Sequence, residues 1–266
     1  MSTILHYKVT SIDEKVLIDL TNFEAEVIGI YHHTFHLLSQ GEVITVGFNL
    51  SEGKHHLIVN GPIDFSESCM VVHEKVKVVD RKIKIGINIY TIDDEAIKSF
   101  KPYMKVFQKH EELPLTLSLL KDMIEKEHDF NLFNYPKDDP WYAFQFAKID
   151  HFLKMPSLQT AKSILGLGSG LTPLGDDILT GYLLACNILN KRPFWAMQII
   201  HLAKQKTSRI AAQNLLDTYQ GYYPKIFIDL IEDVFEVNHL KRTRAILKLG
   251  GTSGAGILTG FLYGCI

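Results

Sequence analysis

The chain has 266 residues, of which 46% are hydrophobic and 22% charged, and its formal net charge is −2. This balance is typical of a soluble globular protein with room for a sizeable core. Lys and Arg are neither in excess nor clustered, which argues against nucleic acid as a partner. The apolar run at residues 178–189 is much shorter than the roughly 20 residues that span a bilayer, so we expect no membrane segment.

The 3 cysteines are Cys69, Cys186 and Cys265, and they form neither a CxxC pair nor a metal-binding spacing. A low, odd count fits a reducing compartment better than a secreted disulfide scaffold. The first residues are mixed in character, unlike a signal peptide. We therefore expect a cytoplasmic protein.

Alternating apolar residues, which are a strand signal, recur along the first third of the chain. The alternating runs are residues 42–48, 56–59, 69–72, 75–79 and 82–90. Turn-like pieces separate several of them. We expect an antiparallel sheet, closed or barrel-like, over residues 1–91.

From residue 92 onward the spacing of apolar residues becomes helical. A helix is predicted over residues 93–109 with a break or kink at Pro102, and another over residues 114–128. A turn-rich connector follows at residues 131–140. Further helices are predicted over residues 141–153, 158–165, 173–189, 193–206, 208–219, 225–235, 239–249 and 255–263. The predicted class is α+β, with a β domain over residues 1–91 and an all-α domain over residues 92–266.

The most informative segment, residues 166–181, reads GLGSGLTPLGDDILTG. Its alternating glycines allow positive φ and a close approach of the backbone to a ligand. Thr172 suits a helix N-cap and Pro173 the first helical position. A helix that starts there directs free N–H groups at the glycine loop, and such an end binds phosphate or carboxylate.

Asp176 and Asp177 fall in the first turn of this predicted helix. Two adjacent carboxylates are compatible with Mg²⁺ and also with a hydrogen-bonded substrate amide, and both alternatives stay open. Adjacent helical residues point about 100° apart. We therefore expect one of them to face a ligand and the other to bond neighbouring backbone. The alternative is that the whole segment has only a structural role, as a tight turn with close helix packing.

A second glycine loop, residues 250–256, reads GGTSGAG, and its Thr252 and Ser253 suit capping or ligand binding. Both loops lead into near-identical sequences, ILTGYL at residues 178–183 and ILTGFL at residues 257–262. We expect two similar loop–helix units whose loops lie close together and face a common cleft.

A third candidate, residues 206–209, reads KTSR. Thr207 and Ser208 suit a helix cap, and Lys206 and Arg209 supply positive charge, although a solvated cap is the commoner case. The closely spaced histidines of the β region, including His32 and His36, have no acidic partner in sequence, so no metal site is expected there.

The first motif resembles a bacterial family long catalogued as a domain of unknown function, which includes the AllH-like subunit of oxamate carbamoyltransferase. The matching positions are Gly170, Leu171, Thr172, Pro173, Gly175, Asp176 and Asp177 in the first loop, Thr207 and Ser208 in the third, and Thr252, Ser253 and Gly254 in the second. Gly256 departs from the family, whose members often carry an acidic residue there.

The resemblance implies a subunit of a hetero-complex that converts oxalurate and phosphate to oxamate and carbamoyl phosphate in allantoin degradation. From the residues themselves, the predicted catalytic residues are Asp176 and Asp177; no metal-binding residue is assigned, and Mg²⁺ stays a possible cofactor. The predicted substrate-binding residues are Gly168, Ser169, Gly170, Leu171, Thr172, Thr207, Ser208, Arg209, Thr252, Ser253 and Gly254. The alternative is a non-catalytic scaffold or ligand-binding subunit whose glycine loops only pack helices.

Overall fold

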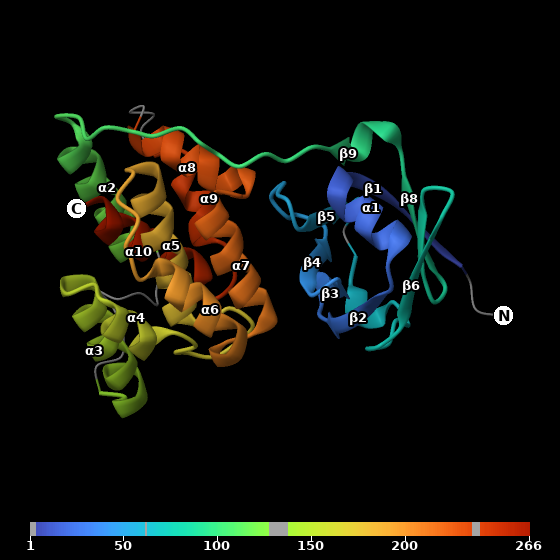
Figure 1. Ribbon diagram of the computed structural model, residues 1–266, viewed down its shortest axis with the longest axis horizontal. Helices are drawn as coiled ribbons and strands as arrows, with labels where there is room; N and C mark the ends of the chain where they lie inside the picture. Colours follow the sequence, from blue (N-terminus) through green and yellow to red (C-terminus); the bar gives the residue numbers. More distant parts are fainter. Residues whose placement is uncertain (1–3, 62, 128–137, 236–239) are drawn as a thin grey trace. The chain divides into compact units, whose positions relative to one another are not determined.

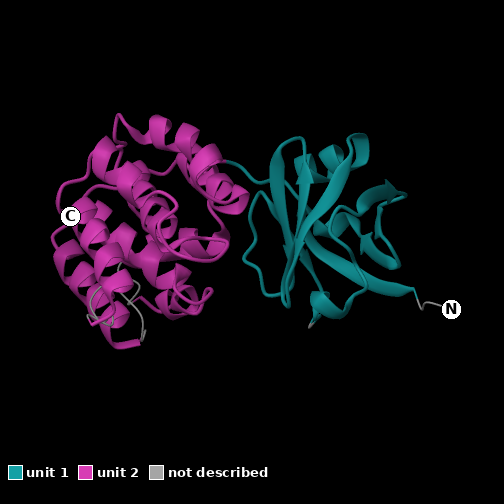
Figure 2. Cartoon of the chain, turned by 90° about the horizontal axis from the view of Figure 1, so that it is seen from below, with its two compact units in different colours: residues 1–101 teal, residues 102–266 magenta. Residues whose placement is uncertain are grey.

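The computed structural model describes residues 4–61, 63–127, 138–235 and 240–266. The chain divides into two compact units, residues 1–101 and 102–266 (Figure 2). The first unit holds the described strands and the second the long helices, which confirms the predicted α+β class (Figure 1). Within the described ranges, no helix combines the length and apolar character that crossing a membrane requires.

The sheet of the first unit closes on itself. Its strands are β1 (Leu5–Asp13), β2 (Ala25–Ile30), β3 (Thr34–Ser39), β4 (Glu42–Gly47), β5 (His56–Val59), β6 (Lys75–Val79), β7 (Lys82–Ile85), β8 (Asn88–Ile92) and β9 (Ile97–Lys98). The order is β5-β4-β3-β2-β6-β7-β8-β1-β9, and an additional β5–β1 pairing closes the barrel. Most pairs are antiparallel as expected, but β1–β8, β4–β5 and β1–β9 are parallel, so the sheet is mixed.

Tight turns set the register of two hairpins. Gln40 and Gly41 both have positive φ between β3 and β4, and Asp80 and Arg81 do the same between β6 and β7. Two consecutive positive-φ residues form the turn that matches the twist of a two-residue hairpin. Alternate side chains of β2 and β8 then point into the barrel, where they are buried.

Two strand predictions need correction. Residues 69–72 are not a strand, because Cys69, the first of them, and His73, the residue that follows them, both take positive φ, which an extended strand excludes. The run at residues 82–90 is two strands, β7 and β8, because Gly86 turns the chain at a φ of 55°. Strands β1 to β3 were not predicted, and neither was the helix α1 (Glu14–Asn22), whose first turn is capped by the Asp13 carboxylate.

The predicted helix over residues 93–109 is wrong. The segment contains the short 3₁₀ turn η2 (Asp94–Ala96), β9 and then extended chain. Pro102 removes a donor from any helix there, and backbone N–H groups bond elsewhere instead. Tyr103 N–H donates to the Gly221 carbonyl and Phe107 N–H to the Ile188 carbonyl, both at 2.8 Å, so the strand-like segment is tied to the helical unit.

The other predicted helices are present, with small shifts at their ends. They are α2 (Leu113–Glu127), α3 (Pro140–Lys154), α4 (Leu158–Ile164), α5 (Leu174–Ile188), α6 (Ala196–Lys206), α7 (Arg209–Gln220), α8 (Lys225–Phe235), α9 (Thr243–Leu247) and α10 (Ser253–Cys265). Capping explains several starts: Asp139 caps α3, and Ser157 and Thr160 form a capping box on α4. The predicted connector at residues 131–140 and residue 239 lie largely or wholly outside the described residues.

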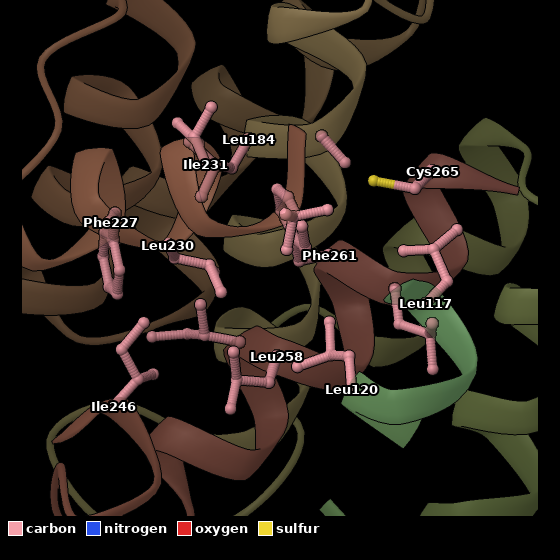
Figure 3. Close-up of a cluster of buried hydrophobic side chains, with 14 of the residues drawn as sticks. Leu117, Leu120, Leu184, Phe227, Leu230, Ile231, Ile246, Leu258, Phe261 and Cys265 are labelled. Carbon is pink, nitrogen blue, oxygen red and sulfur yellow. The ribbon is translucent and has the colours of Figure 1, made fainter. Parts of the chain in front are cut away.

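Helix α5 is the centre of the helical unit, since it is buried on nearly all sides. One side of it packs with α2, α8, α9 and α10 in a cluster that includes Leu184, Phe227, Leu230, Leu258 and Phe261 (Figure 3). Its other side packs with α3, α4, α6 and α7 around Phe146, Phe152 and Trp195. A helix that is apolar all round is expected to lie in a core, and α5 does.

Candidate functional site

The first glycine loop connects α4 to α5 through close backbone contacts. The carbonyl of Ile164, the last residue of α4, packs on Gly175, where an added Cβ would lie 1.9 Å from the carbonyl oxygen. The chain then turns so that Leu167 N–H donates to Ile164 O at 2.9 Å and Gly175 N–H donates to Leu167 O at 2.8 Å. At position 175, in the first turn of α5, any residue other than glycine would collide with the Ile164 carbonyl.

The second glycine loop repeats this arrangement between α9 and α10. A Cβ added at Gly254 would lie 1.8 Å from the Ile246 carbonyl oxygen. Leu249 N–H donates to Ile246 O at 2.9 Å, and Gly254 N–H donates to Leu249 O at 3.0 Å. The two similar loop–helix units that the ILTG echo predicted are therefore present as a structural repeat, here called the first and second units of the repeat.

The two ILTG helices cross at their glycines. A Cβ added at Gly181 of α5 would lie 1.9 Å from the Ile257 carbonyl oxygen, and one added at Gly260 of α10 would lie 2.0 Å from the Ile178 carbonyl oxygen. Equivalent positions of the repeat thus make reciprocal contacts, as in a symmetric pair. The repeated ILTG sequence was visible from the sequence, but the crossing of the two helices at its glycines was not predicted.

The helices run parallel. Near their starts, a Cβ at Gly256 would touch Leu174, and near their ends one at Gly264 would touch Tyr182 and Ala185. Both N-termini therefore lie at one end of the pair. Because each helix N-terminus carries roughly half a positive charge, the two fields add there.

Hydroxyl groups join the two N-termini, at a place we call the junction. The Thr172 and Ser253 hydroxyls are hydrogen-bonded at 2.7 Å, so the two loops lie side by side as predicted. Thr172 is not the N-cap of α5, because the helix starts one residue later with Pro173 in the cap position. Neither Pro173 nor Thr252, the cap residue of α10, makes a side-chain cap hydrogen bond within the described structure. These two helix ends are left without side-chain caps.

A third helix start, that of α7, is tied to the first loop. Ser208 is its N-cap, as predicted, and its hydroxyl oxygen accepts from Ala211 N–H at 3.0 Å. The same hydroxyl donates to the Leu171 carbonyl. The third candidate segment therefore lies beside the first, and its cap residue holds the loop.

Asp176 joins the first glycine loop to the start of α7 through two hydrogen bonds. One of its oxygens accepts from Gly166 N–H at 2.8 Å, and the other accepts from the Thr207 hydroxyl. Burial raises the pKa of Asp176 to about 6, while the bonds from Thr207 and Gly166 act in the opposite direction. One of the two adjacent acids thus bonds neighbouring backbone, as expected.

Asp177 faces α10 instead. Only 4% of the residue is exposed. Ser253 of α10 is close enough to influence its carboxyl group, and Gly256 leaves room for Asp177, since a Cβ there would lie 3.0 Å from Asp177 Cβ. Its Oδ2 is buried and has no hydrogen-bond partner among the described residues. Burial, and secondarily the charge of Asp176, raise the pKa of Asp177 well above its usual range, while the nearby Ser253 hydroxyl acts in the opposite direction.

The donors around these acids do not match Mg²⁺, which demands octahedral oxygen ligands and keeps several waters. Both oxygens of Asp176 already accept hydrogen bonds, and Asp177 is shut off from solvent. Across the part of the chain that the structure describes, no group of 3 or more His, Cys, Asp or Glu side chains is placed to hold a metal ion. The magnesium alternative therefore does not fit.

The remaining predicted residues divide into loop and packing positions. Ser169, Gly170 and Leu171 are exposed at the tip of the first loop, and Gly168 bends beneath them, with a φ of 122°. Gly254 is explained by its contact with the Ile246 carbonyl. Arg209 is exposed at the first position of α7. Their roles in binding stay predictions.

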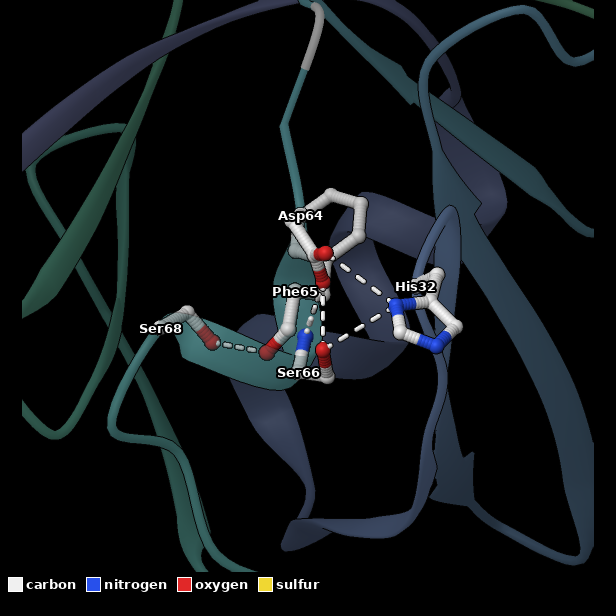
Figure 4. Close-up of polar contacts among 5 residues, drawn as sticks. All are labelled: His32, Asp64, Phe65, Ser66 and Ser68. Carbon is white, nitrogen blue, oxygen red and sulfur yellow. Dashed lines mark hydrogen bonds and ion pairs between the residues drawn. The ribbon is translucent and has the colours of Figure 1, made fainter.

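A second carboxylate–hydroxyl cluster lies in the β unit, where His32, Asp64 and Ser66 meet (Figure 4). It is not a catalytic triad, because the Asp64 and Ser66 oxygens both contact the same ring nitrogen, Nδ1, at 3.1 and 3.2 Å. Ser66 N–H also donates to Asp64, as in an ordinary Asx turn. With 77% of the His32 side chain exposed, the cluster is a solvated turn.

A hollow of about 510 Å³ lies at the other end of α10, between its last residues and the start of α2. Its lining includes Lys109, His110, Leu117, Lys121 and Cys265. This position is remote from the junction along α10. The common cleft that we predicted for the two glycine loops stays a prediction.

Comparison with known proteins bears on the helical unit. No solved structure was found to match the chain. A family model does match residues 164–265, which run from the end of α4 through α10 and so contain both units of the repeat, the start of α7 and the two aspartates. The predicted resemblance is thereby confirmed: this part of the helical unit matches the family described as oxamate carbamoyltransferase subunit AllH.

Proposed function

We propose that the chain is a subunit of an oxamate carbamoyltransferase-like enzyme and that the junction binds its small anionic substrate. The observation that carries this proposal is the hydrogen bond between Thr172 and Ser253, which holds two uncapped, parallel helix N-termini together. Free N–H groups and the positive ends of two helix dipoles favour a carboxylate or phosphate at such a place.

The chemistry of the reaction suits this site. Oxalurate and oxamate carry carboxylates, and phosphate and carbamoyl phosphate carry phosphoryl oxygens, so every ligand is a small anion. The exposed loop at residues 169–171 offers backbone N–H groups, and Thr172, Thr252 and Ser253 offer hydroxyls from both helix starts. Lys206 and Arg209, exposed beside the start of α7, offset negative charge as it shifts in the transition state.

A subunit requires partners. The matching family is described as a subunit, and we therefore propose that this chain works in a hetero-complex, in the cytoplasm, during allantoin and purine nitrogen degradation. In this proposal, Asp176 holds the loops of the site in position and Asp177 is the acidic group closest to the junction. The catalytic role predicted for both stays a prediction.

One observation favours the alternative, a non-catalytic scaffold. The glycines at 175, 181, 254 and 260 are each explained by contact with a carbonyl of another helix, without any ligand. If packing were their whole purpose, the loops would bind nothing. The two functions differ in whether the isolated chain binds small anions, because a ligand that binds the folded state stabilises it.

The deciding experiment is isothermal titration of the full chain with oxamate, inorganic phosphate and carbamoyl phosphate in turn. The double variant Thr172→Val/Ser253→Ala removes both junction hydroxyls and is expected to weaken anion binding by about tenfold or more, since a hydrogen bond to a charged group contributes about 1.5–3 kcal/mol. Ser157→Ala is the matched control: it removes a hydroxyl cap from α4 but leaves the junction intact.

The expected result is binding of at least one of the three anions by the wild type and by Ser157→Ala, with loss in the double variant. Absence of binding for all three would favour the scaffold. Equal binding by the double variant and the control would show that an anion binds elsewhere, for example at the hollow between α2 and α10, whose lining includes Lys109 and Lys121.

A further inference from the structure

The hollow between α2 and the end of α10 has an apolar floor. Positions 113, 117 and 121 of α2 line it, and residues four apart lie on the same side of a helix. Leu113 and Leu117 of α2 and Leu262 and Cys265 of α10 form the floor and belong to one buried cluster, in which Figure 3 labels Leu117 and Cys265. The volume of about 510 Å³ falls within the range of small-molecule sites, about 300–1,000 Å³.

The rim of the hollow is positively charged. Lys109 and Lys121 line it and are exposed, and none of the described residues in its lining is an Asp or a Glu. Lys109 Nζ donates to the Ile266 carbonyl oxygen at 2.7 Å. Lys121 has an ion-pair partner in Glu125 at 3.6 Å, one turn further along α2 and outside the lining. The charged side chains that line the hollow are therefore all cationic.

Backbone hydrogen bonds hold this wall of the hollow in place. Phe107, two residues before Lys109, donates its N–H to the Ile188 carbonyl at 2.8 Å, which ties the extended segment to the end of α5. Leu113 N–H donates to the His110 carbonyl at 3.1 Å, so the chain turns into α2 directly after Lys109. A hollow that is formed before its ligand arrives reduces the ordering cost of binding.

We propose that this hollow is a second binding site, for a small aliphatic monocarboxylate. The hydrocarbon chain packs on the apolar floor, and Lys109 and Lys121 bind the carboxylate at the rim, where Ser118 also offers a hydroxyl donor. A singly charged head suits the hollow better than a phosphate dianion, because charge brought close to apolar side chains costs free energy. The site does not depend on the proposed function, since the 13 residues of α10, about 20 Å of helix, separate it from the junction.

The test is an NMR titration of the full chain with labelled leucine methyl groups and with hexanoate as the probe. Hexanoate is expected to shift the methyl signals of Leu113, Leu117 and Leu262 in a saturable way. From butanoate through hexanoate to octanoate, the affinity is expected to rise about three- to fourfold per methylene, because each added CH₂ moves from water onto the apolar floor. An affinity that does not depend on chain length would overturn the inference.

Two comparisons test the charged rim. Hexanamide keeps the hydrocarbon chain but carries no charge, and Lys121→Met removes one rim charge from the protein. Each change is expected to weaken binding about three- to fivefold, the range of an exposed ion pair. Lys126→Met is the matched control, because Lys126 also pairs with an acid on α2, Asp122, but does not line the hollow.

A blocking variant locates the site. Ser118→Trp places a large ring at the rim and is expected to abolish hexanoate binding, whereas Leu119→Trp, at the next exposed position but outside the lining, is expected to leave it unchanged. Hexanamide binding as tightly as hexanoate would overturn the inference and favour an apolar side chain of a partner subunit as the occupant. Absence of methyl shifts with every acid, or equal binding by Ser118→Trp, would also overturn it. None of these outcomes decides the junction, whose test uses anions without a hydrocarbon chain.

Discussion

The two units of the repeat share the same backbone contacts but differ in loop length and in the side chains of the first helical turn. In both, a carbonyl from the last turn of one helix packs on a glycine in the first turn of the next. A leucine three residues after that carbonyl donates its N–H to it, and a helix with the sequence ILTG follows. The first unit has 7 residues, 168–174, between the leucine and that glycine, whereas the second has 4, residues 250–253. The first also carries Asp176 and Asp177 where the second has Ala255 and Gly256.

This difference separates architecture from candidate function. The shared glycines are required by backbone contacts, so they would be needed in a protein that binds nothing. The longer loop and the two acids are not required by the shared backbone contacts, since the second unit of the repeat makes the same contacts without them. Residues present only in the first unit of the repeat are therefore the better candidates for a role in binding or catalysis.

The largest expected effect comes from breaking the shared crossing. A side chain at Gly181 or Gly260 would collide with a backbone carbonyl of the partner helix, so Gly181→Val and Gly260→Val are each expected to lower the free energy of unfolding by about 3 kcal/mol or more. Urea denaturation followed by tryptophan fluorescence measures this. Gly251→Ala is the control, because nothing lies within 4 Å of its added Cβ. A mild effect at one position only would show that the crossing is not reciprocal.

The two acids in the first unit of the repeat make the stability of the helical unit depend on pH. The pKa of Asp176 is raised from 3.8 to about 6, so the folded state binds more protons than the unfolded state between these values. This contribution is fully present below pH 3.8 and is lost as pH rises through about 6, and two pKa units correspond to about 3 kcal/mol. Asp177 acts in the same direction. Tryptophan fluorescence reports the helical unit, since Trp141 and Trp195 both lie there.

The β unit is expected to respond in the opposite direction. Burial lowers the pKa of His36 from 6.5 to about 4, so its contribution is present above pH 6.5 and is lost as pH falls toward 4. Hydrogen exchange, corrected for the intrinsic rate at each pH, separates peptides of the two compact units. If acidification from pH 7 to 4.5 stabilised both units or destabilised both, the burial argument for Asp176 or His36 would be wrong.

A smaller effect is expected at the bond that fastens the first loop. Thr207→Val removes the hydroxyl that donates to Asp176 and is expected to cost about 1.5–3 kcal/mol where Asp176 is ionised, and less below pH 6. Thr116→Val is the control, because that hydroxyl donates to the carbonyl of Glu112, the residue just before its own helix, and contacts no carboxylate there. A loss of stability that does not vary with pH would assign Thr207 a packing role alone.

The smallest effect on stability is expected from making the two loops equal in length. Deleting residues 169–171 removes exposed residues and one hydrogen bond from Ser208, at a cost of about 1 kcal/mol. Oxamate binding should nevertheless be lost, because the deleted segment supplies the N–H groups of the proposed site. Retained binding in a stable variant would move the anion site away from the first loop.

Local chemistry made the helical part predictable. The glycine loop, Pro173 and the ILTG sequence located α5, and Ser208 was correctly expected to cap α7. The wrong helix at residues 93–109 shows the limit, because its apolar spacing reflects contacts of extended chain with Gly221 and Ile188, far along the sequence. Strands β1 and β3 were missed because burial in a closed barrel does not require strict alternation, and both strands bury consecutive residues.

The geometry of the site was only partly predictable. Ser253 meets Thr172 from 81 positions away, and only the ILTG echo hinted at their proximity. The raised pKa values come from burial that α10 and α7 impose, which no local motif reveals. Independent folding of residues 1–91 and 92–266 stays a prediction, which expression of each segment would test.

The pairing of Asp177 with Gly256 has a consequence for how the protein holds its proton. These residues occupy equivalent positions, each directly before ILTG, and they touch where the two helices begin. An aspartate at both positions would place two like carboxyl groups across a local dyad, where they would share one proton and titrate in two separated steps. Because position 256 is glycine, only one of the two equivalent positions carries a carboxyl group, and the pair is not symmetric there. The acid with the raised pKa therefore belongs to α5 alone, and the helix pair has a single inner acid instead of a shared one.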